Sequence, residues 1–126
     1  MIGLTRAVRV FAYGAPVDMR RGFNGLAAMV EHEIGHDVLR GDAYLFVGRG
    51  CRRAKVLYFD GTGLCLLAKR LEKGRFARPW SREKGPTISM TLSELALFLE
   101  GADLLERKII TPPAFERKDL AMKIPV

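Results

Sequence analysis

Three short apolar segments, each separated from the next by a glycine-containing turn, dominate the middle of this 126-residue chain. They cover residues 43–47, 54–59 and 64–71. The two turns between them are too short to hold a crossover helix, so neighbouring strands must pair antiparallel. The sequence therefore predicts a β meander. The second and third segments are apolar at successive positions, which predicts strands that are covered on both faces.

Two further segments have the apolar spacing of helices. Apolar residues recur at helical intervals between residues 19 and 34, which predicts one amphipathic helix there. Asp18 is the expected N-cap of this helix, and Gly35 is its expected stop. Thr91 and Glu94 are three residues apart before an apolar run, which predicts a capping box at the start of a second helix.

Alternating apolar residues at 8–13 predict a first strand, and residues 87–90 a last one. We therefore expect a single α+β domain in residues 1–104, with an antiparallel β meander of about five strands packed with two main helices. A chain of this length holds one core and is too short for two domains. Residues 105–126 carry prolines and mixed charge, which predicts a loosely ordered C-terminal tail.

The positive charge of the chain is concentrated in one segment. The net charge is +7, and residues 49–78 contain nine basic and two acidic residues, so this segment carries the whole excess. A localised basic patch is typical of a surface that binds phosphates. The alternative is a solvated face that keeps the protein soluble. The candidate DNA-binding residues are Arg49, Arg52, Arg53, Lys55, Lys69, Arg70, Lys73 and Arg75.

Aromatic residues lie between these basic residues along the chain. Tyr58, Phe59 and Phe76 belong to this group, and Trp80 follows closely. Nucleic-acid bases stack on aromatic rings while basic side chains neutralise phosphates. For Phe59 and Phe76 the favoured interpretation is a place in the core, so the basic turn residues are the better candidates for contact.

One string resembles a catalytic motif. His32, Glu33 and His36 form a His-Glu-x-x-His pattern, which on a helix places two imidazoles near one zinc ion with a general base beside them. His32 and His36 are the only histidines of the chain, and Gly35 is expected to end the helix before His36. A chance string at a helix end is therefore favoured, and a zinc metallopeptidase remains a remote alternative.

Catalytic carboxylates for phosphoryl transfer are not indicated either. Asp18 has the position of a cap, Asp60 that of a turn residue, and Asp103 follows the end of a helix. We therefore predict a protein that is not an enzyme and that has no catalytic residues, no metal site and no cofactor.

The chain also lacks the features of secreted and membrane proteins. The N-terminus has no long apolar core of a signal peptide, and no apolar run is long enough to span a bilayer. We therefore expect a cytoplasmic protein without membrane association. Cys51 and Cys65 have neither redox nor zinc spacing, which predicts two free thiols.

Three strings of the sequence resemble a known family. They are VDMRRGFNGL at residues 17–26, KVLYFDGTGL at residues 55–64 and KRLEKGRF at residues 69–76. Together they resemble the TnpB-type accessory proteins encoded by the second reading frame of insertion sequence 66 family bacterial transposable elements. The resemblance extends over about residues 5 to 104. It implies a helper for transposition that acts with a separate, larger transposase carrying the catalytic carboxylates.

Two functions of different classes remain open from the sequence. The leading hypothesis is a non-catalytic accessory protein for DNA transposition, which binds DNA phosphates through the basic hairpin segment, assists a separate transposase, or does both. The alternative is a pure protein-interaction module that docks on the transposase. DNA and the transposase are thus the expected partners, and a homo-oligomer is compatible with either function.

Overall fold

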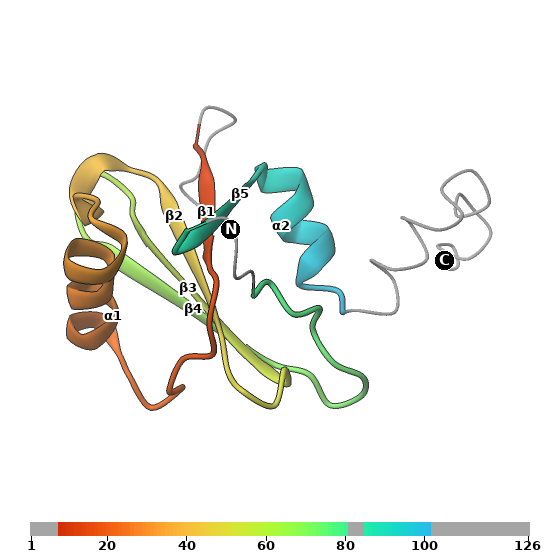
Figure 1. Cartoon of the computed structure of the whole chain (residues 1–126). Helices are drawn as coiled ribbons and strands as arrows, with labels where there is room; N and C mark the ends of the chain where they lie inside the picture. Colours follow the sequence, from red (N-terminus) through yellow and green to blue (C-terminus); the bar gives the residue numbers. More distant parts are fainter. Residues whose placement is uncertain (1–7, 81–84, 102–126) are drawn as a thin grey trace.

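The structure is a computed structural model that describes residues 8–80 and 85–101. Five strands form one sheet, with helices on both faces (Figure 1). The strands are β1 (Val10–Tyr13), β2 (Ala43–Val47), β3 (Arg53–Phe59), β4 (Leu64–Arg70) and β5 (Thr87–Met90). The helical segments are α1 (Phe23–Met29), its π-helical continuation η1 (Val30–Ile34), the short 3-10 helix η2 (Val38–Arg40) and α2 (Leu92–Phe98). The α+β class, the five strands and the two main helices are confirmed.

The sheet is mixed, in the order β4-β3-β2-β1-β5. Strands β2, β3 and β4 form the antiparallel meander that the short turns require. Strand β1 pairs parallel with β2 and antiparallel with β5. The parallel pair departs from the expected antiparallel pattern because α1, η1 and η2 lie between the two strands. This connection is long enough to cross over one face of the sheet.

The first helix begins later than the sequence predicted. Its N-cap is Gly22, which has no capping side chain. The prediction that Asp18 caps this helix is wrong, because the Asp18 carboxylate instead pairs with Arg20, at 2.8 Å from Arg20 Nη2. Gly35 ends the helical segment as predicted, in the left-handed conformation with φ of 82°. This conformation favours glycine because glycine lacks a Cβ atom.

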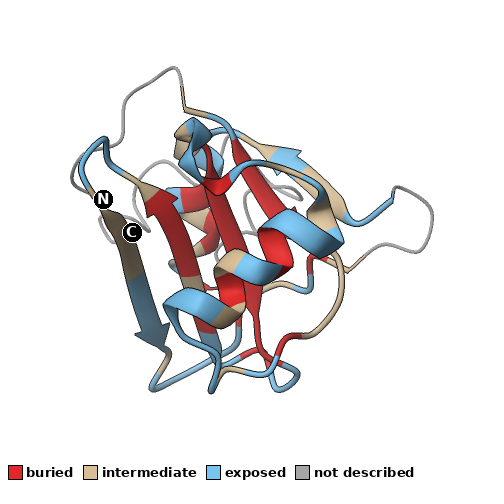
Figure 2. Ribbon diagram, turned by 90° about the vertical axis from the view of Figure 1, so that its left-hand side faces the viewer, coloured by how far each residue is buried: buried red, intermediate tan, exposed pale blue. Residues whose placement is uncertain are grey.

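Two cores lie on opposite faces of the sheet, because side chains alternate along each strand. On one face, α1 and η1 pack against β2 and β3 through Leu26, Val30 and Phe46. On the other face, α2 and the segment that follows β4 pack against the sheet through Leu95, Phe98 and Phe76. Figure 2 shows the buried central strands beneath α1.

Strand β4 lies at one edge of the sheet and is the least covered strand of the meander (Figure 2). Its first three residues are partly buried, and residues 67–70 are exposed. The prediction of cover on both faces therefore holds for most of β3 and is wrong for the second half of β4. The apolar pattern alone did not distinguish an inner strand from an edge strand.

Other sequence predictions fall partly outside the described residues. The expected tail at residues 105–126 lies there, so the structure does not test it.

None of the helices in the described part of the chain has the length and apolar character needed to span a bilayer. Cys51 and Cys65 are both free thiols, as predicted.

The capping box of α2 is confirmed and supplies a stability test. The Glu94 backbone N–H donates to Thr91 Oγ1 at 3.1 Å, and the Thr91 N–H donates to Glu94 Oε1 at 2.8 Å. We expect Thr91→Ala to lower the free energy of unfolding by about 1 kcal/mol, measured by urea denaturation. Ser93→Ala changes an exposed residue in the same turn and should leave stability nearly unchanged. Equal effects of the two substitutions would contradict this role of Thr91.

Candidate functional site

Two turns meet at one end of the sheet and are joined by backbone hydrogen bonds. The first connects β2 to β3, and the second follows β4. The Leu71 N–H donates to the Arg52 carbonyl at 2.8 Å, and the Phe76 N–H donates to the Cys51 carbonyl at 2.7 Å. Cys51 and Phe76 are both buried, and the Phe76 ring stacks on Phe98 with centroids 5.5 Å apart. The core therefore fixes these two turns relative to each other.

Six of the eight predicted DNA-binding residues lie at this end of the sheet, and all six are exposed. We call this group the basic end. It consists of Arg49, Arg52, Arg53, Arg70, Lys73 and Arg75. Within the described residues, the only ion pair in this group joins Arg70 Nε to Glu72 Oε2 at 3.1 Å. The structure thus brings together basic residues that lie up to 26 positions apart in sequence.

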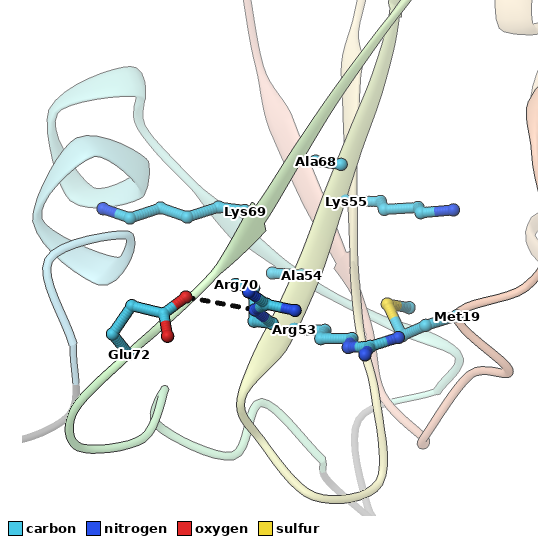
Figure 3. A pocket seen from close by; sticks show the side chains of 8 residues that line it. All are labelled: Met19, Arg53, Ala54, Lys55, Ala68, Lys69, Arg70 and Glu72. Carbon is cyan, nitrogen blue, oxygen red and sulfur yellow. Dashed lines mark hydrogen bonds and ion pairs between the residues drawn. The ribbon is translucent and has the colours of Figure 1, made fainter.

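Arg53 and Arg70 are directly opposite each other on β3 and β4. Opposed residues of paired strands share a face, so the two guanidinium groups belong to the same side of the sheet. The next pair on this side is Lys55 and Ala68. These four residues line an open hollow of about 460 Å³, together with Met19, Ala54, Lys69 and Glu72 (Figure 3). Its strand positions are basic except for the two small alanines, Ala54 and Ala68.

The two predicted lysines of the strands point to opposite faces (Figure 3). Lys55 lies on the α1 side, and its ammonium donates to the Arg21 carbonyl at 2.8 Å. Lys69 lies on the α2 side, where its ammonium donates to the Leu99 carbonyl at 2.7 Å. A cation is favourable there because the carbonyls at the end of α2 carry partial negative charge. Lys69 therefore extends toward the α2 side of the sheet, while it still lines the hollow beside Arg70.

Arg21 is a neighbour of this site that was not among the predicted residues. The hydrogen bond from Lys55 places its backbone beside the basic strands, and its side chain is exposed. Charge counting did not indicate Arg21, because it lies in the part of the chain where basic and acidic residues balance. The only signal was its place in the 17–26 string that resembles the family.

The His-Glu-x-x-His string does not form the helix of a zinc peptidase. Gly35 ends η1, and His36 lies beyond it. His36 Nδ1 is 3.0 Å from the Tyr44 hydroxyl, and its ring packs edge-on against Phe11 with centroids 4.7 Å apart. Partial burial lowers the pKa of His36, and the nearby Arg40 lowers it further. No cluster of three or more metal-ligating side chains occurs in residues 8–80 and 85–101.

The carboxylates considered for catalysis have local structural partners. Asp60 Oδ1 accepts hydrogen bonds from the backbone N–H groups of Thr62 and Gly63, each at 2.9 Å, which closes the turn between β3 and β4. The turn position expected from the sequence is therefore observed. Asp18 pairs with Arg20, as described above, and Asp103 lies outside the described residues.

Comparisons with known proteins identify the family. A family model described as "IS66 Orf2 like protein" matches residues 8–108. This chain belongs to the IS66 Orf2-like family. It is thus an accessory protein of transposition, as the three sequence strings predicted. The match covers both turns of the basic end.

Two curated relatives come from Sinorhizobium fredii. One, called "Uncharacterized protein y4jC", is 36% identical over 115 residues, covering 90% of this chain and 97% of the relative. The other, called "Uncharacterized protein y4hO", is 38% identical over 96 residues, covering 76% and 82%. No solved structure matches the chain significantly.

The Asp60 turn predicts a pH dependence of stability. Hydrogen bonds from Thr62 and Gly63 lower the pKa of Asp60 from its ordinary 3.8 to about 2. A carboxylate with a lowered pKa in the folded state stabilises the fold above its unfolded pKa, and this contribution is lost as pH falls through the folded pKa. We expect Asp60→Ala to lower Tm most above pH 3.8 and progressively less toward pH 2.

Asp60→Asn is the matched control, because it keeps an acceptor oxygen that cannot titrate. The Tm difference between Asp60→Asn and the wild type should shrink over the same pH range. The Tm of Asp60→Asn itself should lack this acid-dependent loss. A difference between Asp60→Ala and the wild type that stays constant down to pH 2 would contradict this contribution of the ionised carboxylate.

Proposed function

We propose that this accessory protein assists transposition by binding the DNA backbone at the basic end. The proposal rests on the convergence of six exposed basic side chains at one end of the sheet, on two turns fixed by the core and on the adjoining ends of β3 and β4. Arginine offers up to five donors in a planar fork that matches the oxygens of a phosphate. Contacts to phosphates position a protein on DNA without reading its sequence. The chemical step is then left to the separate transposase.

The pairing of Arg53 with Arg70 supports an anion as the ligand. Like charges directly opposite each other on neighbouring strands destabilise a sheet. Glu72 offsets part of this repulsion at Arg70, and within the described residues Arg53 has no acidic partner. A phosphate held between the two guanidinium groups would relieve the repulsion through charge-assisted hydrogen bonds. The small Ala68 side chain leaves room beside them.

Salt dependence provides the test of this proposal. Binding of the full chain to labelled duplexes, with terminal-repeat or random sequence, is measured by fluorescence anisotropy at increasing salt. Each phosphate contact contributes close to one unit to the slope of log affinity against log salt. We expect Arg53→Gln combined with Arg70→Gln to weaken binding on both duplexes and to reduce this slope by about 2.

One variant controls for the loss of positive charge. Arg9→Gln removes an exposed charge beside β1, at the opposite end of the sheet from the basic end. We expect it to leave the slope within about half a unit of the wild type. The absence of any binding at low salt, or equal losses in both variants, would overturn direct DNA binding by this surface.

A second candidate is docking of the basic end on an acidic surface of the transposase. The ion pair between Arg70 and Glu72 supports a carboxylate as a ligand class for this site. We expect the tagged accessory protein to retain the transposase after nuclease treatment if the contact is direct. Loss of the transposase on nuclease treatment would instead leave DNA as the bridge. The Arg53→Gln and Arg70→Gln double variant should weaken a direct contact, and Arg9→Gln should not.

A further inference from the structure

Strand β4 presents a free backbone edge whose residue pattern suits a specific partner. Within the described residues it pairs only with β3, and its other side is the edge of the sheet. Such an edge is a template for another strand, because its outward N–H and C=O groups have no ladder partner. Leu67, in the middle of β4, is one of the exposed large hydrophobic residues of the protein, with 37% of its surface accessible.

Two hydrogen bonds that flank the β3–β4 ladder show which backbone groups face outward. The Leu71 backbone N–H donates to the Arg52 carbonyl at one end, and the Asp60 backbone N–H donates to the Gly63 carbonyl at the other. Hydrogen-bonded pairs alternate with non-hydrogen-bonded pairs along an antiparallel ladder. The odd-numbered residues of β4 therefore direct their N–H and C=O groups toward β3, and the even-numbered residues direct theirs outward. The outward set is Leu64, Leu66, Ala68 and Arg70.

We propose that two copies of this chain pair antiparallel through β4 around a two-fold axis at Leu67. This register overlaps all seven residues of the strand. Leu66 and the partner's Ala68 then form a hydrogen-bonded pair, as do Leu64 and the partner's Arg70. The two Leu67 residues meet at a non-hydrogen-bonded position, where opposed side chains are closest. The exposed leucine is thereby buried at the centre of the interface.

Charge complementarity favours a second copy, and it favours this register over registers whose axis is displaced by two residues. Lys69 lies opposite the partner's Cys65, and Cys65 Sγ lies 3.5 Å from Asp60 Oδ2 in each chain. Each Lys69 is therefore opposite a thiol that lies beside a carboxylate, once on each side of the axis. A register displaced by two residues toward the C-terminal end would place the two Lys69 residues opposite each other, which is destabilising. The opposite displacement would leave Lys69 and Arg70 beyond the partner's strand.

The two-fold axis is perpendicular to the sheet, so both copies of α1 lie on the same side of one continuous ten-stranded sheet. The two Arg70 residues are then six positions apart along the paired strands, which corresponds to about 20 Å. The two basic ends therefore lie at opposite ends of the ten-stranded sheet, with their Arg53 and Arg70 pairs on the same face. The dimer itself does not rest on the proposed DNA binding, although it would present two phosphate-binding surfaces to one duplex.

The mass of the full chain in solution tests the dimer. Protein freed of nucleic acid by nuclease and high salt is measured by light scattering during gel filtration. We expect twice the 14.1 kDa of one chain. Leu67→Asp places two carboxylates together at the axis and should return the mass to one chain while the variant remains folded. Ser89→Asp adds the same charge to an exposed position of β5, the other edge strand, and should leave the dimer intact.

Cross-linking tests the register. In a Cys65→Ser background, Leu67→Cys should form an intermolecular disulfide, because Cα atoms at a non-hydrogen-bonded pair are about 4.5 Å apart. Ala68→Cys faces the partner's Leu66 and should not cross-link. A wild-type mass of one chain, a dimer that survives Leu67→Asp, or equal cross-linking at both positions would overturn the proposal. A further outcome would also overturn the dimer: a wild-type protein of monomeric mass that retains the transposase, and a Leu67→Asp variant that does not. The β4 edge would then bind a strand of the transposase.

Discussion

Strand β2 is buried on both faces, and this burial dictates how the other elements are arranged. All five of its residues have no accessible surface. A strand of this kind must lie inside a sheet that has a cover on each side. The chain meets this requirement with α1 and η1 on one face and with α2 and Phe76 on the other. On the α1 face, the hydroxyl of Tyr44 in β2 lies 3.0 Å from Nδ1 of His36. His36 lies just beyond the end of η1.

This central position of β2 also decides where charge accumulates. The turn that leaves β2 and the turn that leaves β4 lie at the same end of the sheet, because three antiparallel strands carry the chain up, down and up again. Both turns are held to the core by Cys51 and Phe76. The exposed basic side chains therefore project from a rigid base. Functional groups are often carried on loops that a packed scaffold positions in this way.

Local signals predicted the elements well where one residue decides the geometry. Gly35 ends a helix because its φ of 82° favours a residue without Cβ, and Thr91 begins one because its side chain accepts a backbone N–H. The signal at Asp18 was equally local but had a competitor. Arg20 binds its carboxylate in the loop before the helix, so the helix begins after Gly22 instead.

The amino-acid pattern was enough to predict that the positive charge lies in one segment, that three strands form a meander, and that three strings of the chain resemble a transposition accessory family. Each of these depends on residues that are neighbours in the chain. The parallel pairing of β1 with β2, the edge position of β4 and the placement of Lys69 and Arg70 on opposite faces followed only from the fold. These outcomes depend on which strands pair and in what register, because a shift of one residue moves every side chain to the other face.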